Sequence, residues 1–332
     1  MAKKNKNKIR NDNANRQKKI HKILILIMKK FKFFIIVFLI SLAFWVGINI
    51  FQKTVEDFFY SKAMKEIPPL SYTAQISFPL EYKVQEEPQM SAESAILVEI
   101  NKQGEEQMVF KKNEKEKMAI ASLTKLMTGL VALEFYQPKL ETKISEKAVS
   151  QPEQTGFLKI GERLKVEDLL YIALIESSND AAFALAEIIK QESFVDLMNL
   201  KAEDIGLKDT HFFNSNGIDG GAFDTNYSTA EDLIKLAKYV WIKRPLIVEI
   251  LSNKKYSLYL ENGRLHHIIY NTNTLLGENP KIISGKTGFT SKAGECLLLF
   301  FKGEKAENYY IAIVLNSQNR FEDMKKLIKY AI

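Results

Sequence analysis

The feature that most constrains this chain is an uncharged apolar run, Phe33–Phe51, directly behind a strongly basic segment. Its length is close to the ~20 residues that a helix needs to cross a bilayer. Residues 1–32 carry twelve Lys or Arg and one Asp, a net charge of +11, whereas the whole chain carries +7. The remaining residues therefore carry −4. Because basic flanks stay on the cytoplasmic side, we expect a single-pass anchor in the cell membrane, with the N-terminus cytoplasmic and the body extracytoplasmic.

This charge distribution argues against nucleic acid as a partner, because a nucleic-acid-binding domain should itself be basic. A cleaved signal peptide is the alternative interpretation of the apolar run, but the run is long and no small-x-small cleavage site follows it. We expect a basic cytoplasmic tail over 1–32, a transmembrane anchor over 33–51, a proline-containing stalk over 52–90 and a folded domain over 91–332.

The folded domain is expected to place strands at both ends and helices between them. The expected strands cover 95–100, 107–111, 281–287, 295–301 and 309–315, with a further hairpin, 256–260 and 265–270, around Asn262-Gly263. The expected helices cover Ser122–Tyr136, Val166–Ile175 and Ala181–Lys190. A further helix is expected to open with a capping box of Ser228 with Glu231 and to run through Trp241, with Pro245 after it, and a last helix runs from about Phe321 to the end. This order predicts an α/β (α+β) fold with an antiparallel sheet built from the two termini and a helical insertion.

The single cysteine, Cys296, excludes an intrachain disulfide. It lies in an apolar run that continues to Phe301, so we expect it to be a buried core residue rather than a reactive thiol. No cluster of His, Cys and Asp has the spacing of metal ligands, so the sequence implies neither a metal nor an organic cofactor.

The first motif that could carry chemistry is Ser122-Leu123-Thr124-Lys125, at the start of an expected helix. Positions three apart share a helix face, so the lysine amine can reach the serine hydroxyl. A serine needs such a base to become a nucleophile. A lysine can act as that base only where its surroundings lower its pKa.

Two further motifs contain residue types that could complete such a site. Ser177-Ser178-Asn179 falls in a break between two expected helices, where a serine can relay a proton and an asparagine can hold a substrate amide. Lys286-Thr287-Gly288 falls at the end of an expected strand, where the glycine allows close approach of a substrate backbone. Lysine and threonine at that position could bind a substrate carboxylate.

Each motif is weak when taken alone, because the chain repeats two of them elsewhere. Ser252 with Lys255 also has the Ser-x-x-Lys spacing, and Ser317 with Asn319 repeats Ser-x-Asn. A helix cap, a turn and an ordinary strand end would explain the three motifs separately. Their order, their structural contexts and the 55 residues between Ser122 and Ser177 together are typical of penicillin-interacting serine enzymes.

The similarity extends well beyond these motifs. Residues 92–332 resemble the D-alanyl-D-alanine carboxypeptidase family, the low-molecular-mass penicillin-binding proteins. The segments that carry the resemblance are Ser94–Glu134, Ser178–Ala182, Leu207–Phe212, Asn216–Asp219 and Ser284–Gly294. The resemblance implies the β-lactamase/transpeptidase fold, in which helices pack on a five-stranded antiparallel sheet and the site lies between the sheet and a helical lobe.

The resemblance also implies an activity, the hydrolysis of peptidoglycan stem peptides ending in D-Ala-D-Ala, with inhibition by β-lactams. In that scheme Ser122 attacks the carbonyl between the terminal D-alanines, and Lys125 accepts its proton. Ser177 and Lys286 pass a proton to the leaving amine. Asn179 orients the acyl part of the substrate.

The remaining implied roles concern substrate binding. The backbone amides of Ser122 and Phe289 would form the oxyanion hole. Thr287 and Arg320 would bind the terminal carboxylate, beside Gly288. Phe289 stands where the family often has histidine, so we expect substrate preference to change more than chemistry. Many members also carry a C-terminal β-rich domain and a terminal anchor. We expect the N-terminal apolar run to take the place of that anchor.

Several alternatives remain open at this stage. The same fold and motifs occur in β-lactamases and DD-endopeptidases, and a membrane-tethered wall-binding protein could retain a relic site. A β-lactamase would need a glutamate to position water, and Glu153, Glu162 and Glu176 match no such motif. A Ser-His-Asp hydrolase is disfavoured because no Gly-x-Ser-x-Gly is present. His211, His266 and His267 are therefore expected to be structural or surface residues.

Overall fold

The computed structural model describes residues 86–332, apart from 103, 153–155, 222–223 and 304–307, together with the isolated positions 38, 41 and 54. The chain divides into two compact units, Met1–Tyr82 and Lys83–Ile332, and nearly all described residues belong to the second. Apart from those isolated positions, the expected tail, anchor and most of the stalk lie outside the described residues. No helix within the described part is long and apolar enough to cross a membrane.

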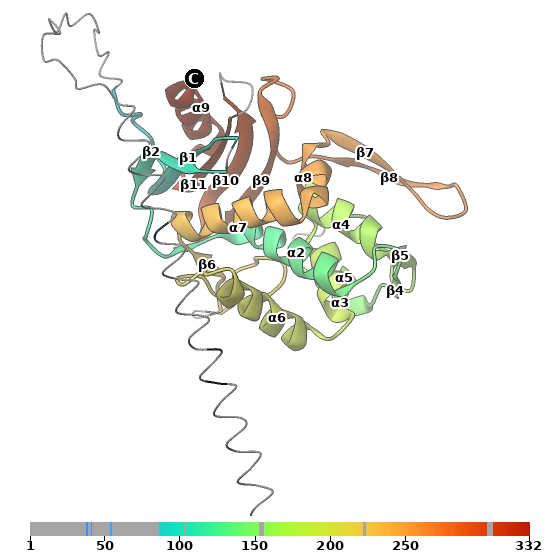
Figure 1. The fold of residues 1–332 in the computed structure, drawn as a ribbon. Coiled ribbons are helices and arrows are strands. Elements are labelled where there is room, and N and C mark those ends of the chain that lie inside the picture. The colour runs from blue at the N-terminus through green and yellow to red at the C-terminus, as the bar shows by residue number, and fades with distance from the viewer. Residues whose placement is uncertain are drawn as a thin grey trace, which may run out of the picture. The chain divides into compact units, whose positions relative to one another are not determined.

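A five-stranded antiparallel sheet forms the centre of the second unit (Figure 1). Its strands are β1 (Ser94–Ile100), β2 (Glu106–Lys112), β9 (Ile282–Thr290), β10 (Gly294–Lys302) and β11 (Tyr309–Ser317), in the spatial order β2-β1-β11-β10-β9. The first two strands come from the start of the domain and the last three from its end. The prediction of an antiparallel sheet built from both ends of the domain is therefore confirmed.

The segment between the two groups of strands is mainly helical. It contains η1 (Ala121–Thr124), α2 (Lys125–Phe135), α3 (Glu146–Val149), α4 (Val166–Ile175), α5 (Asn179–Glu187), α6 (Gln191–Asp204), α7 (Ala230–Lys243) and α8 (Pro245–Ser252). Three two-stranded pairs lie among these helices: β3 (Met118–Ala119) with β6 (Tyr227–Ser228), β4 (Glu141–Lys143) with β5 (Arg163–Lys165), and the hairpin β7 (Lys255–Tyr259) with β8 (Leu265–Tyr270). A last helix, α9 (Arg320–Ala331), follows β11.

Both faces of the sheet are covered, α7 contacting one face and α9 the other (Figure 1). Successive strand residues point to opposite faces, so Ile96 of β1 packs towards the helical segment and Leu97 packs towards α9. Alternate residues of β10 also point to opposite faces, and both faces are covered. The sequence of β10 is therefore continuously apolar. Cys296 on this strand is fully buried, as expected, and burial raises the pKa of its thiol to about 11.

Some sequence-based boundaries were wrong for identifiable reasons. Thr229, not Ser228, caps α7, because its hydroxyl accepts the Asp232 amide while Ser228 pairs with Met118 between β6 and β3. Pro245 does not simply follow a helix but opens the next one, α8, at a position where proline lacks no needed donor. Helix α6, whose hydrophobic face is sparse, was not anticipated.

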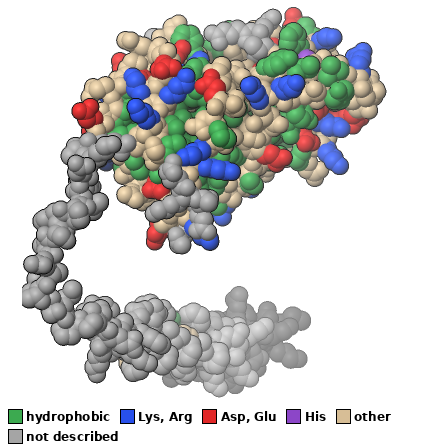
Figure 2. All heavy atoms as spheres, turned by 90° about the horizontal axis from the view of Figure 1, so that it is seen from above, with side chains coloured by type: hydrophobic (Ala, Val, Ile, Leu, Met, Phe, Trp, Pro, Cys, Tyr) green, Lys and Arg blue, Asp and Glu red, His purple; other side chains and the backbone are tan. Residues whose placement is uncertain are grey.

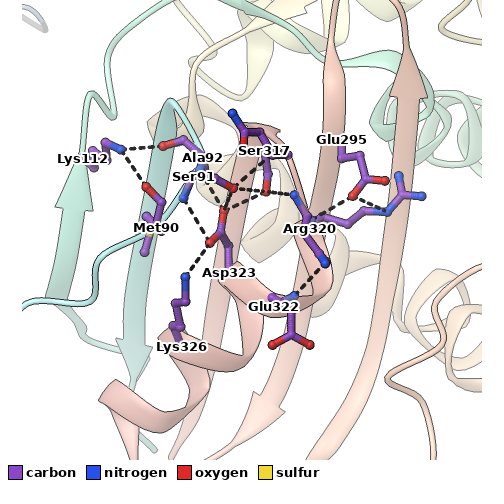
Figure 3. Close-up of polar contacts among 12 residues, drawn as sticks. Met90, Ser91, Ala92, Lys112, Glu295, Ser317, Arg320, Glu322, Asp323 and Lys326 are labelled. Carbon is purple, nitrogen blue, oxygen red and sulfur yellow. Dashed lines mark hydrogen bonds and ion pairs between the residues drawn. The ribbon is translucent and has the colours of Figure 1, made fainter.

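A buried carboxylate fixes the start of the domain to its last helix (Figure 3). Asp323 accepts hydrogen bonds from the Ser91 amide and hydroxyl at 3.1 and 2.6 Å, from the Ala92 amide at 2.8 Å and from the Ser317 hydroxyl at 2.7 Å. Burial alone would raise the pKa of Asp323, but these hydrogen bonds outweigh it and hold the pKa below its ordinary value. The first residues of the expected folded domain are therefore tied to its last helix.

The surface of the body is electrostatically mixed on the face that Figure 2 displays. Lys and Arg side chains are interspersed there with Asp and Glu and with hydrophobic side chains. This agrees with the mildly acidic balance of the sequence behind the basic tail.

Candidate active site

Ser122 and Lys125 meet at the point where a short 3-10 turn becomes helix α2. In a 3-10 turn, side chains three residues apart eclipse one another, which brings this pair together. The distance between Lys125 Nζ and Ser122 Oγ is 2.7 Å. The helix prediction over 122–136 is thus confirmed in substance, with the difference that its first turn is 3-10.

Lys125 is completely buried, and its amine contacts two other oxygens besides the serine hydroxyl. Nζ lies 2.7 Å from Asn179 Oδ1 and 2.6 Å from the Asn216 carbonyl oxygen. Both oxygens can only accept hydrogen bonds, so they take up two amine hydrogens. The third contact is the Ser122 hydroxyl, so the amine is held within hydrogen-bond distance of the group that it would have to deprotonate.

Ser177 occupies the turn between α4 and α5 with a left-handed backbone, φ +68°. Non-glycine residues adopt this conformation at a cost, and it persists only where the surroundings impose it. Here Ser178 caps α5 by accepting the Ala181 amide, and Asn179 becomes the first residue of the helix. The turn therefore brings Asn179 Oδ1 to the Lys125 amine.

Lys286 closes the site from strand β9. Its Nζ donates to Ser177 Oγ at 2.8 Å and to its neighbour's carbonyl, Thr287 O, at 2.9 Å. The side chain is almost fully buried. Burial, with a smaller effect of the Arg320 cation, lowers the pKa of Lys286 to about 7. This lysine can therefore change its protonation state near neutral pH.

Strand β9 is longer than the sequence indicated, because it continues through Thr290. The expectation that Lys286-Thr287-Gly288 would end the strand was therefore wrong. The motif lies inside it, with Gly288 paired to Cys296 of β10. Because β9 is an edge strand of this sheet, its outer side can receive a further extended chain.

Two glycines allow backbone segments to crowd around Ser122. A Cβ atom on Gly288 would lie 3.0 Å from Ile120 O and 3.2 Å from Ser122 N. Gly217 has φ +85°, and a Cβ there would lie 2.1 Å from Ala121 O. Any side chain at Gly217 would thus displace the segment that carries the serine.

The residues expected to bind a carboxylate lie at the same strand. The Thr287 hydroxyl is 2.5 Å from that of Thr272. Arg320, the first residue of α9, donates from Nη1 to Gly288 O at 2.6 Å, and its backbone amide donates to Glu295 at 2.9 Å (Figure 3). Phe289, the next residue along β9, is 55% exposed. The structure therefore brings all nine sequence-predicted site residues to one region.

Some contacts of the site were not anticipated. The Asn216 carbonyl holds Lys125, Thr272 touches Thr287, and Glu295 holds Arg320. Asn216 also donates from its side chain to Gln151, in the wall of a neighbouring cavity of about 740 Å³. The sequence signals for this wall were the segments Leu207–Phe212 and Asn216–Asp219. By contrast, the repeated motifs lie outside the site. Ser252 is at the end of α8, and the Ser317 hydroxyl donates to Asp323.

Metal ligation finds no support in the described part of the chain, where no group of three or more His, Cys, Asp or Glu is arranged to hold an ion. The chemistry available at the site is that of two serine–lysine pairs, Ser122 with Lys125 and Ser177 with Lys286.

Comparison with known proteins decides the family. Residues 81–319 match the family model described as D-alanyl-D-alanine carboxypeptidase. The chain belongs to this family. Among similar carboxypeptidases, DacF of Bacillus subtilis (strain 168) is 34% identical over 251 residues, which are 72% of this chain and 62% of DacF. A D-alanyl-D-alanine endopeptidase of Escherichia coli (strain K12) is 30% identical over 227 residues, covering 64% of this chain and 68% of the relative.

Solved structures of related enzymes share the fold. Penicillin-binding protein D2 of Listeria monocytogenes, in its cefotaxime-bound form, aligns with a TM-score of 0.65 and 27% identity over 74% of this chain and 99% of that one. A variant of the Streptomyces K15 DD-transpeptidase aligns with a TM-score of 0.66 and 26% identity over the same shares. The penicillin-binding/transpeptidase fold, with its five-stranded antiparallel sheet, is therefore confirmed for the second unit.

Proposed function

We propose that this chain is a serine-type D-alanyl-D-alanine carboxypeptidase that acts on peptidoglycan stem peptides through an acyl-enzyme and is inhibited by penicillins. The observation that carries the proposal is the pair of lysine–serine contacts, Lys125 with Ser122 and Lys286 with Ser177, at 2.7 and 2.8 Å. One pair can activate a nucleophile, and the other can deliver a proton to the leaving group.

Acylation begins with attack of Ser122 Oγ on the carbonyl carbon between the two terminal D-alanines. The hydroxyl proton moves to the Lys125 amine, whose other hydrogens are held by Asn179 and Asn216. The backbone amides of Ser122 and Phe289 supply hydrogen bonds to the oxygen that becomes negatively charged. The close packing of Gly288 on Ser122 keeps these two backbone segments together.

Collapse of the tetrahedral intermediate breaks the C–N bond. The leaving amine takes a proton from the Ser177 hydroxyl, and Ser177 regains one from Lys286. A pKa of about 7 suits this transfer, since the ideal catalytic pKa lies near the operating pH. Free D-alanine departs, and water then attacks the ester on Ser122. The water proton passes through Ser177 to Lys286, and Lys125 returns its proton to Ser122 Oγ as the acyl bond breaks, which restores both lysines.

Selection of a chain terminus rests on Thr287 and Arg320. The Arg320 guanidinium is held against β9 by the Gly288 carbonyl and lies 3.9 Å from the Glu295 carboxylate. A guanidinium matches a carboxylate geometrically, and a free carboxylate distinguishes a carboxypeptidase substrate from an internal peptide bond. This observation favours carboxypeptidase over endopeptidase activity, although one relative carries the latter name.

The N-terminal part supports a proposal about location. The apolar run Phe33–Phe51 behind the basic tail favours a single-pass anchor with the catalytic unit outside the cytoplasm. Protease added to intact spheroplasts should digest the body and leave the first residues protected. A body digested only after lysis would contradict this topology.

Product analysis tests the activity and separates the alternatives. Incubation with a pentapeptide ending in D-Ala-D-Ala should release one D-alanine and leave the tetrapeptide, and Ser122→Ala should abolish the release. Ser252→Ala, which alters the second Ser-x-x-Lys motif, is the matched control and should retain activity. A β-lactamase would instead turn over penicillin rapidly and leave the peptide intact, whereas a non-catalytic wall-binding protein would process neither.

A further inference from the structure

Four side chains beside the Ser177 turn form a continuous hydrogen-bonded chain, Glu162–His266–His267–Glu176. Nε2 of His266 lies 3.2 Å from Glu162 Oε2, the two histidine Nδ1 atoms are 2.6 Å apart, and Nε2 of His267 lies 3.2 Å from Glu176 Oε1. The side chains are only 5–16% exposed. The two histidines are thus structural, as expected, but their arrangement with two glutamates was not anticipated.

The chain of contacts joins three separate elements. Both histidines belong to β8, in the hairpin that projects beside α4 (Figure 1). Glu162 precedes β5, and Glu176 follows α4 as the residue immediately before Ser177. The hairpin is therefore connected on one side to the β4–β5 region and on the other to the turn that carries Ser177.

The two histidines link the two glutamates. Nε2 of each ring faces a carboxylate, and Nδ1 of each ring faces the other ring. The four side chains therefore form one connected arrangement that ends at Glu176, next to Ser177.

Further groups lie around the histidine pair. Asp168 of α4 interacts electrostatically with His266. The ring of Phe157 is tilted against that of His267, with 5.2 Å between the ring centroids.

The same hairpin touches the site at a second point. Just beyond β8, the Thr272 amide donates to Ile175 O at 3.2 Å, and the Thr272 hydroxyl contacts Thr287. The strained turn at Ser177 thus lies between two anchors, Glu176–His267 and Ile175–Thr272. We propose that His267, supported by His266, is a positioning residue for Ser177 that acts through its contact with Glu176.

This inference rests on the proposed function, because Ser177 is the residue being positioned. The test is the second-order rate constant for acylation by a labelled penicillin. The rate constant of each variant is expressed as a ratio to that of the unsubstituted protein.

His267→Ala should acylate about tenfold more slowly, as expected for loss of one hydrogen bond to a carboxylate. His267→Gln keeps a donor for Glu176, so it should recover most of the rate. Ile268→Ala, on the exposed face of the same strand, is the matched control and should give a ratio near one.

A His267→Ala ratio near one, or a His267→Gln variant as slow as His267→Ala, would overturn the inference. If His267→Ala fails to fold, Glu176→Ala removes the other partner of the contact and should slow acylation to a similar degree. Failure of the unsubstituted protein to acylate would refute the proposed function itself. Normal acylation of that protein with ratios near one in the variants would refute only the role of the histidines.

Discussion

Lys286 donates a hydrogen bond to Ser177 at 2.8 Å across 109 residues of sequence, and this contact joins strand β9 to the helical segment. It places a group with a pKa of about 7 next to the serine proposed as proton carrier. Below that pH the lysine is charged and can resupply the proton, and above it this capacity falls. The pH dependence of the reaction rate should therefore show the ionisation of Lys286.

Replacement of Lys286 by methionine should lower kcat/KM for the pentapeptide by about 10²-fold or more, the range for loss of a general acid–base group. The decline in rate that begins near pH 7 should disappear at the same time, because the titrating group is gone. The measurement is a pH–rate profile of D-alanine release. An unchanged alkaline limb in Lys286→Met would assign that ionisation to another group.

Arg320→Ala should reduce kcat/KM on peptides with a free D-Ala-D-Ala terminus by about ten- to a hundredfold, the effect of one charge-assisted contact. The same peptide with an amidated end should react slowly already and change little. Arg264→Ala, an exposed arginine in the β7–β8 turn, serves as the control. Equal losses on both substrates would place Arg320 in the fold or the general chemistry instead of the carboxylate site.

Gly217→Ala should destabilise the protein and slow acylation, because its Cβ would collide with Ala121 O at 2.1 Å in a left-handed backbone. Gly263 has a similar φ of +76° but nothing within 4 Å of a built Cβ, so Gly263→Ala reports the backbone strain alone. We expect Gly217→Ala to lower the free energy of unfolding by about 1–3 kcal/mol more than the control. Thermal unfolding curves of the two variants provide the comparison, and equal losses would contradict the steric explanation.

Asp323→Asn should weaken the attachment of the domain's first residues to α9. Because the folded state holds the pKa of Asp323 below its ordinary value, the unfolded chain binds more protons at acidic pH. The stabilisation is thus fully present above the ordinary aspartate pKa and is lost as pH falls through the lower, folded value. Asp323→Asn should lower Tm at neutral pH. At acidic pH the difference in Tm between this variant and the unsubstituted protein should become smaller. A difference in Tm that does not change with pH would show that the stabilisation does not depend on the carboxylate charge.

Local features of this fold could be predicted from the sequence, because they depend on short-range geometry. Ser122 and Lys125 lie within one turn, and the apolar residues of β10 and β11 identify buried strands directly. The site as a whole could be predicted only because three motifs matched a known family in their order and structural context. From spacing alone, nothing joined Lys286 to Ser177.

The features that could not be predicted depend on the backbone or on tertiary contact. The acceptor at Asn216 is a carbonyl, which every residue possesses, so the side chain gives no signal. The cap of α7 fell at Thr229 because Ser228 was needed in the β3–β6 pairing. In the sequence, His266 and His267 cannot be distinguished from ordinary polar residues of a hairpin. Their partners Glu162 and Glu176 are distant in the sequence, and only the fold brings them into contact.

The identity of the nucleophile can be measured most directly by mass spectrometry of the intact protein after exposure to penicillin. One added drug mass is expected, because Ser122 is the hydroxyl that faces the Lys125 amine. Peptide mapping should place that mass on Ser122, and Ser122→Ala should not acquire it, whereas Ser252→Ala should. An adduct that persists in Ser122→Ala, or that maps to another residue, would contradict the assignment of Ser122 as the nucleophile.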